Sequence, residues 1–175
     1  GILTESFSQT FYCAAQPTVN LLGALEYVTH YPYGCLEQTV SSVFPLLALG
    51  DVTRRLPAKS SSLAEEAPDL INAAIVRVLS MRSYDGFAMW PDAGESSWPA
   101  TVYAAHFLVE AAQAGYPVSK ATLDEAAGQL EERLERSTCE APAYICHVLA
   151  LAGRPNHGWL LRLFEQTHAL SVEER

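Results

Sequence analysis

The stretch from Tyr31 to Thr39, YPYGCLEQT, places a glutamine three residues after a cysteine. Side chains three residues apart on a helix share one face, so Cys35 and Gln38 are candidates for a direct reaction. We expect a helix to begin at Cys35, where the positive end of the helix dipole favours a thiolate. A thiolate that attacks the carboxamide carbonyl can expel ammonia and leave an internal thioester, which is activated toward amines and hydroxyls.

The neighbouring residues fit the same chemistry. Gly34 permits close backbone approach just before the turn, and Glu37 suits the positive end of a helix. A thioester survives only where water is excluded, so Tyr31 and Tyr33 are candidates to shield it. Each residue also has an ordinary interpretation, because a lone cysteine is more often a buried structural thiol and a tyrosine more often a packing residue.

The sequence PYGCLEQ resembles the thioester motif of the α-macroglobulin and complement family, whose shared core is Gly-Cys-x-Glu-Gln. The lead YPYG is most similar to the bacterial α-2-macroglobulins. A later segment, DGFAMWPDAGESSWPATVYAAHFLVEA, resembles the hairpin that follows the motif in that family. The likeness covers most of residues 17–117. The core motif falls on Gly34, Cys35, Leu36, Glu37 and Gln38.

The resemblance implies an α/α-toroid thioester domain within a very large protein that traps proteases. Cleavage of a bait region would expose the thioester, and a lysine amine of the protease would then open the Cys35–Gln38 bond. The protease would stay attached through Gln38, and Cys35 would be released as a free thiol. Because each molecule reacts once, the resemblance implies a protease inhibitor and not an enzyme, with no cofactor and no metal.

Further expectations follow from the same resemblance. Tyr31 stands four residues before Cys35, where a tyrosine shields the bond in the bacterial members. Complement members that prefer hydroxyl acceptors use a histidine in the loop after the Gly-Phe motif, and AMWPDAGESS contains none, which favours direct reaction with amines. The implied partners are proteases as covalent targets and other domains of the same parent chain. The implied location is the periplasm, in a parent that can be membrane-anchored.

The elements that must position these residues are predicted to be helical. Apolar residues recur at helical spacing and no segment alternates convincingly as a strand, which indicates an all-α fold. Buried and amphipathic helices alternate, as in stacked αα-hairpins. Residues 51–66 are predicted as a polar linker and residues 84–99 as an ordered loop. Helices are predicted over residues 17–31, 35–49, 67–83, 100–115, 119–136, 140–153 and 156–170.

We therefore expect residues 1–175 to form a single helical thioester-type domain. It would be an incomplete part of an α/α toroid and a fragment of a much larger chain. The formal net charge is −9 and no Lys/Arg cluster occurs, which argues against nucleic-acid binding. No apolar run is long enough to cross a bilayer, so direct membrane insertion of this segment is not expected.

The remaining cysteines, histidines and tryptophans have structural interpretations. The four cysteines lack paired CxxC spacing, which argues against a structural metal site. A helix is predicted to hold both Cys139 and Cys146. Buried free thiols are expected at Cys13, Cys139 and Cys146, core histidines at His106 and His147, and tryptophans that fasten the loop at Trp90 and Trp98.

Two alternatives from other classes remain open on the sequence alone. One is an α/α-toroid enzyme of the terpene cyclase or prenyltransferase kind, which would need an acidic cluster, and no Asp-rich motif occurs. The other is a non-catalytic helical interaction module, against which the intact Cys35 and Gln38 count.

Overall fold

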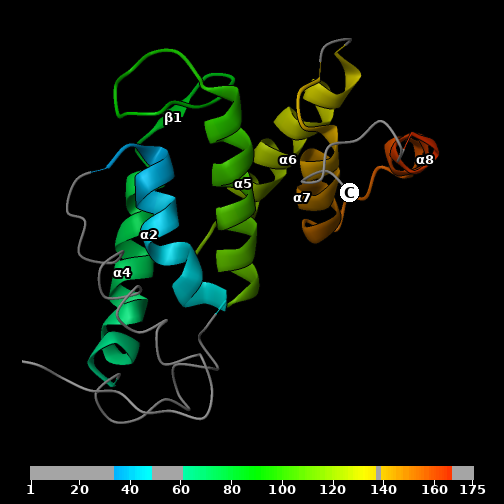
Figure 1. The fold of residues 1–175 in the computed structure, drawn as a ribbon. Helices are drawn as coiled ribbons and strands as arrows, with labels where there is room; N and C mark the ends of the chain where they lie inside the picture. The colour runs from blue at the N-terminus through cyan, green and yellow to red at the C-terminus, as the bar shows by residue number, and fades with distance from the viewer. Residues whose placement is uncertain (1–33, 49–60, 137–138, 167–175) are drawn as a thin grey trace, which may run out of the picture.

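A computed structural model describes residues 34–48, 61–136 and 139–166 (Figure 1). The all-α prediction is confirmed for this part of the chain, which holds six helices and one short hairpin. The predicted helix over residues 17–31 lies outside the described residues. The helices are α2 (Leu36–Ala48), α4 (Ser61–Leu79), α5 (Trp98–Gln113), α6 (Lys120–Glu135), α7 (Pro142–Leu151) and α8 (His157–Glu165), and the strands are β1 (Arg82–Ser83) and β2 (Gly86–Phe87).

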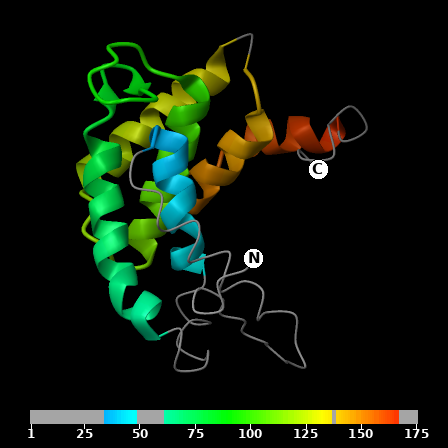
Figure 2. The same cartoon turned by 60° about the vertical axis from the view of Figure 1, so that its left-hand side comes forward.

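The helices stack as αα-hairpins. In sequence order, α2, α5 and α7 pack one against the next, while α4 lies against α2 and α5, and α6 lies against α5 and α7. The last helix, α8, packs on α7 and extends away from the rest (Figure 2). This two-row arrangement is that of an α/α-hairpin stack, as the alternation of apolar and amphipathic segments predicts. Within the described segments, no helix combines the length and the apolar character that crossing a membrane requires.

Helix α5 separates two hydrophobic cores and contributes side chains to both. Phe107 and Leu108 are fully buried in the first core, with side chains of α2, α4 and the hairpin. Val102 and Ala105 are buried in the second, with side chains of α6, α7 and α8. A helix buried on both sides must be apolar nearly all round, which explains the composition of this segment.

The bounds of α4 differ from the prediction at both ends. The helix begins at Ser61, inside the predicted linker, and ends at Leu79, four residues before the predicted end. It accommodates Pro68 in its interior. Its end is set by tertiary contacts. Met81 is buried in the first core and its carbonyl accepts from the Ala88 backbone N–H at 2.8 Å, which draws the chain into the hairpin.

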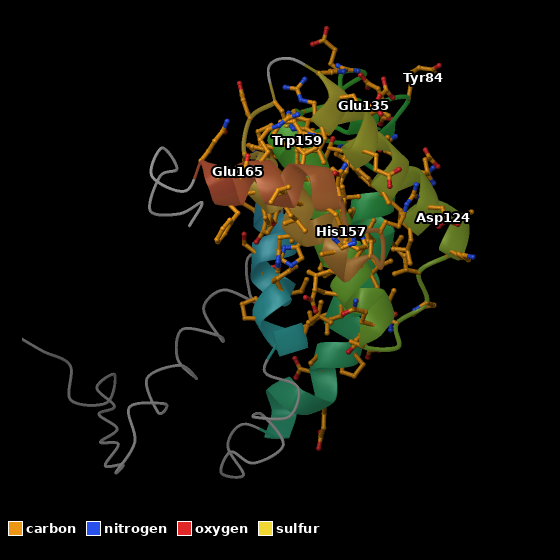
Figure 3. The ribbon with its side chains drawn as sticks, turned by 90° about the vertical axis from the view of Figure 1, so that its right-hand side faces the viewer. Tyr84, Asp124, Glu135, His157, Trp159 and Glu165 are labelled. Carbon is orange, nitrogen blue, oxygen red and sulfur yellow. The ribbon has the colours of Figure 1, made fainter. Side chains whose placement is uncertain are left out.

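The turn, β2 and the loop that follows occupy the segment predicted as an ordered loop, whereas β1 replaces the end of the helix predicted over residues 67–83. Arg82 pairs with Phe87 and Ser83 with Gly86 in antiparallel register, strands too short to show alternation in the sequence. At the turn, Tyr84 is fully exposed and points away from the body of the molecule (Figure 3). Gly86 adopts φ +152°, and a β-carbon there would lie 2.3 Å from Thr101 Oγ1, so only glycine fits.

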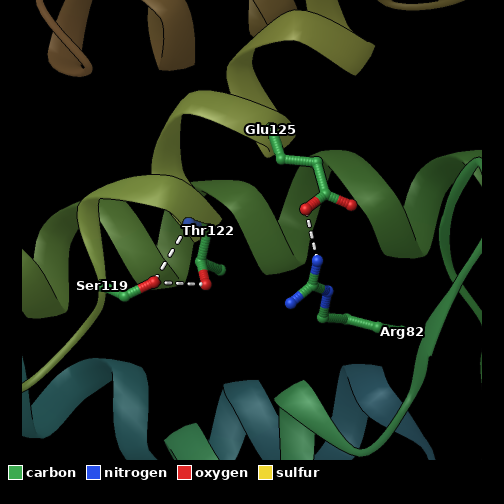
Figure 4. A network of polar contacts seen from close by, with 4 residues as sticks. All are labelled: Arg82, Ser119, Thr122 and Glu125. Atoms are coloured by element: carbon green, nitrogen blue, oxygen red, sulfur yellow. Dashed lines mark hydrogen bonds and ion pairs between the residues drawn. The ribbon is translucent and has the colours of Figure 1, made fainter.

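A proline marks the start of α5, and a side-chain cap fixes the start of α6. Helix α5 begins at Trp98, two residues before the prediction, with a proline in its first turn where a missing N–H costs nothing. The predicted cap of α6 is confirmed, because Ser119 Oγ accepts from the Thr122 backbone N–H at 3.1 Å (Figure 4). The Arg82 guanidinium pairs with the Glu125 carboxylate and ties the hairpin to α6 (Figure 4).

Candidate functional site

The first turn of α2 brings Cys35 and Gln38 together. The Gln38 side chain turns back along the helix, and its Oε1 accepts a hydrogen bond from the Cys35 backbone N–H at 3.1 Å. Cys35 is half-buried and Gln38 is exposed. The carboxamide of Gln38 is therefore held over the residue that carries the thiol.

Gly34 makes room for this arrangement. It is buried, and a β-carbon at this position would lie 2.5 Å from Gln38 Cβ and 3.1 Å from Gln38 Oε1. The first of these distances is far below van der Waals contact, so any side chain at position 34 would displace Gln38. The glycine is required here for space.

The peptide group between Gly34 and Cys35 is contacted on both of its polar atoms. Its N–H donates to Gln38 Oε1, and its carbonyl oxygen lies 3.5 Å from Thr39 Oγ1 and 3.5 Å from Arg77 Nη2. Arg77 is a half-buried residue of α4. It was not singled out in the sequence, because nothing local marks a residue 43 positions away as a neighbour of the cysteine.

The loop after the hairpin holds the start of α2. The Met89 carbonyl accepts from the Leu36 backbone N–H at 2.8 Å, which satisfies one of the free donors at the helix N-terminus. The loop is in turn fastened to α5, because Thr101 Oγ1 accepts from the Phe87 N–H at 2.9 Å and donates to the Ser97 carbonyl at 2.9 Å. Thr101 is fully buried and was also missed, although a hydroxyl in an otherwise apolar helix is a visible signal.

This geometry suits nucleophilic attack on the Gln38 carbonyl. Attack by the Cys35 sulfur would place negative charge on Oε1, and the Cys35 N–H already donates to that atom. A donor in place before charge develops lowers the barrier, and the positive end of α2 adds to the effect. The first turn of α2 therefore places a hydrogen-bond donor at the oxygen of Gln38 that such an attack would charge.

Comparison with known proteins identifies the domain. The profile of the A-macroglobulin TED domain matches residues 12–137. The chain belongs to the A-macroglobulin TED domain family.

Relatives of this TED domain are bacterial alpha-2-macroglobulins. The protein from Xylella fastidiosa strain Temecula1 is 30% identical over 135 residues, which are 77% of this chain and 8% of the relative. The protein from Escherichia coli K12 is 33% identical over 106 residues, which are 60% of this chain and 6% of the relative. The chain thus spans less than a tenth of the length of these relatives.

Solved structures confirm the fold. Native E. coli alpha-2-macroglobulin, spanning domain MG7 to the C-terminus, superposes with a TM-score of 0.69 at 26% identity, covering 84% of this chain and 25% of that chain. Salmonella alpha-2-macroglobulin reacted with methylamine superposes with a TM-score of 0.66 at 28% identity, covering 85% of this chain and 11% of that chain. The helices of this TED domain are those of the α/α toroid that the sequence predicts.

The other residues predicted for the site of this TED domain are Tyr31, Tyr33 and Glu37. Tyr31 and Tyr33, the expected shield, lie outside the described residues. Glu37 is exposed, and its carboxylate forms no hydrogen bond with Cys35 or Gln38. It borders a groove of about 570 Å³ that Tyr103 and Tyr144 also line. Among the described residues, no three His, Cys, Asp or Glu side chains gather as metal ligands would.

The thiols outside the motif are only partly as predicted. Cys146 is buried in the second core and carries no disulfide, and burial raises the pKa of its thiol. Cys139 is also free but only half-buried, and it precedes α7, so the prediction of one helix for both cysteines is wrong. The helix begins only at Pro142. Cys13 lies outside the described residues.

Two further assignments need correction. His147 is exposed and is not a core histidine. Trp90 is 51% exposed and does not fasten its loop, a role that belongs to Thr101. By contrast, His106 is half-buried and bonded through Nδ1 to the Tyr144 hydroxyl at 2.9 Å. Trp98 is the first residue of α5 and packs on the second core under the Arg133 guanidinium, so its role in fastening the loop stays a prediction.

Proposed function

We propose that this TED domain forms an internal thioester between Cys35 Sγ and Gln38 Cδ and serves its protein as a covalent protease trap. The observation that carries the proposal is the 3.1 Å hydrogen bond from the Cys35 N–H to Gln38 Oε1 at the start of α2. In the forming step, the sulfur bonds to Cδ, the C–N bond breaks, and the thiol proton leaves with the nitrogen as ammonia. In the trapping step, an amine bonds to Cδ, the C–S bond breaks, and one amine proton passes to the Cys35 thiolate.

The names of related structures support this reading. The Salmonella protein was crystallised after reaction with methylamine, a small primary amine, and E. coli alpha-2-macroglobulin was crystallised after activation by trypsin. For the present chain, we infer the same two classes of partner: amines as acceptors and proteases as covalent targets. The loop segment AMWPDAGESS offers no histidine to carry an acyl group, which supports direct aminolysis.

The proposal extends to the setting of the domain. We infer that residues 1–175 act as one thioester-type domain among other domains of a longer parent chain, in the periplasm. The trap is used once per molecule. Aminolysis leaves the target joined through an amide bond to the Gln38 side chain and leaves Cys35 as a thiol, so the thioester is not regenerated. The toroid-enzyme and interaction-module alternatives are not favoured, since the relatives that match are alpha-2-macroglobulins.

The deciding experiment is the intact mass of the natively purified protein before and after methylamine, with a free-thiol assay. We expect a mass short by one ammonia, then a methylamine adduct on Gln38 and one new thiol at Cys35. Cys35→Ala and Gln38→Ala should each abolish both changes. Cys139→Ala is the matched control, because it removes a half-buried thiol outside the site and should leave both changes intact. A full calculated mass with a free Cys35 and no adduct would reject the proposal.

A further inference from the structure

The Gly34–Cys35 peptide group connects α4 to the reacting carbonyl. On one side its N–H donates to Gln38 Oε1 at 3.1 Å. On the other side its carbonyl oxygen has two donors at 3.5 Å, the Thr39 hydroxyl and the Arg77 guanidinium. The two sides belong to one planar unit, because the peptide bond does not rotate freely. Whatever orients the carbonyl therefore also orients the N–H.

The charge of Arg77 acts through the same unit. A cation beside a peptide oxygen draws electron density toward that oxygen and makes the N–H at the other end a stronger donor. At 3.5 Å the contact is long for a hydrogen bond, so the guanidinium acts on the carbonyl mainly through its charge. A guanidinium at the Gly34 carbonyl thus strengthens the bond that the Cys35 N–H makes to Gln38.

Arg77 is placed for this role by the end of α4. The Ser80 hydroxyl donates to the Arg77 carbonyl at 2.6 Å and secures the last turn of the helix, while α4 packs along α2. Within the described segments, no carboxylate forms an ion pair with Arg77. No described carboxylate therefore neutralises the charge of Arg77 where its guanidinium meets the Gly34 carbonyl.

We propose that Arg77 is a positioning residue for the thioester reaction, acting through the Gly34 carbonyl to orient and polarise the Cys35 N–H that stabilises the oxyanion at Gln38. The inference rests on the proposed function. The oxyanion forms when the Cys35 sulfur attacks Cδ and again when an amine attacks the thioester. Arg77 thus promotes both the expulsion of ammonia and the later release of the Cys35 thiol, without touching either reacting atom.

The test compares Arg77→Gln and Arg77→Lys in the natural full-length protein that carries this chain. The rate of thiol release is measured at several methylamine concentrations. The thioester carbonyl stretch is measured by infrared difference spectroscopy before and after methylamine. For Arg77→Gln we expect release about two- to fourfold slower, because polarisation changes the strength of a hydrogen bond by about 10–30%, and a carbonyl stretch at higher frequency. Arg77→Lys should recover part of both, because the charge is retained.

Arg82→Gln is the matched control, since it removes an arginine that pairs with Glu125 at the hairpin and not with α2. It should change neither readout. A residue with a merely structural role would alter the unfolding transition while leaving the carbonyl stretch in place, so the spectroscopic signature separates the two roles.

A second pair of variants changes Thr39 of α2, the other donor to the Gly34 carbonyl. Thr39→Val removes the other donor and should shift rate and stretch in the same direction, whereas Thr39→Ser should not. This pair tests the route through the Gly34 carbonyl, and Arg77→Lys carries the test of Arg77 itself if Arg77→Gln does not fold. If the wild type carries the thioester and neither Arg77→Gln nor Thr39→Val differs from Arg82→Gln, the role of Arg77 is disproved while the proposed function stands. A wild type without the thioester would overturn both.

Discussion

At the scale of single residues, the site depends on space as much as on reactive groups. Gln38 can turn back toward Cys35 only because position 34 carries no β-carbon. The Cys35 N–H then has an acceptor within the first turn of its own helix, as in a capping box. The contact between Cys35 and Gln38 therefore depends on a third residue, Gly34, which contributes by having no side chain.

Gly34→Ala should lower the fraction of protein that carries the thioester by at least about tenfold. The added methyl group would lie 2.5 Å from Gln38 Cβ, so Gln38 must move away from Cys35. Overpacking of this kind also costs about 1–3 kcal/mol of unfolding free energy. Intact mass gives the thioester fraction, and urea denaturation gives the stability.

Gly128→Ala is the control for that substitution. Gly128 lies in α6 with nothing within 4 Å of an added β-carbon, and alanine in a helix interior gains about 0.5–1 kcal/mol over glycine. It should keep the thioester and be slightly more stable. Equal thioester fractions in the two variants would contradict the steric argument.

How far the sequence predicts the site depends on sequence distance. The contact between Cys35 and Gln38 follows from helical spacing alone, because both residues lie in one turn. Arg77 reaches the site from α4 through tertiary packing, and no local pattern marks it. Thr101 of α5 fastens the loop, and its one local signal is a hydroxyl in a largely apolar helix. The resemblance to a known family supplied the chemistry, whereas the hydrogen bonds that organise it required the structure.

At the scale of elements, the hairpin loop connects α5 to α2 through hydrogen bonds at both of its ends. Thr101 fastens its beginning through the Phe87 N–H, and Met89 holds the Leu36 N–H at its other end. The helices themselves are predictable from apolar periodicity. The hairpin and the true end of α4 are not, because two-residue strands carry no period and Met81 is drawn out of helix by a tertiary hydrogen bond.

Thr101→Val should destabilise the domain by about 1–3 kcal/mol, because the buried Phe87 N–H loses its acceptor. The valine nearly matches threonine in volume, so lost packing contributes little. Thr101→Ser retains the hydroxyl and should cost less. Urea denaturation measures both, and hydrogen exchange at the Leu36 amide should rise in the valine variant only. An unchanged rate of hydrogen exchange at the Leu36 amide would disprove the connection from Thr101 through the loop to α2.

Ser119→Ala should cost about 1 kcal/mol, because the Thr122 N–H at the start of α6 loses its cap (Figure 4). Ser119→Asp can accept the same hydrogen bond and should be close to the wild type. Thermal or urea unfolding checks both variants. Equal losses would mean that the serine acts through something besides its cap.

At the scale of the whole molecule, His106 joins the two cores. Its ring lies edge-on to Phe44 of α2 with 4.8 Å between ring centroids, and its Nδ1 bonds to the Tyr144 hydroxyl of α7 at 2.9 Å. Burial raises the pKa of Tyr144 to about 12, which keeps that hydroxyl neutral. Burial, with a smaller effect of His147, lowers the pKa of His106 despite the opposing effect of Glu110.

The domain should therefore lose stability in mild acid. The folded state binds a proton at His106 less readily than the unfolded state, so stability rises with pH across this range. The contribution is complete above about pH 6.5, the ordinary histidine value, and is lost as pH falls toward the lower pKa of the folded state. Urea denaturation over this range measures the slope.

His106→Gln should flatten that slope, because its side chain does not titrate. The exposed His157 offers the control, and His157→Gln should retain the wild-type dependence. A slope that persists in His106→Gln would assign the acid sensitivity to other groups.

The groups that contact Gly34 and Leu36 come from later in the sequence, which has a consequence for the order of folding and acyl-bond formation. The guanidinium that meets the Gly34 carbonyl comes from a residue 43 positions later in the chain, and the loop that holds Leu36 comes later still. At about 5–20 residues per second, a ribosome delivers these groups seconds after the cysteine and the glutamine. During synthesis the pair stands without its supporting contacts. The acyl bond should therefore form late, once the α2–α4–hairpin unit has folded, so that folding itself protects the nascent chain from premature acylation.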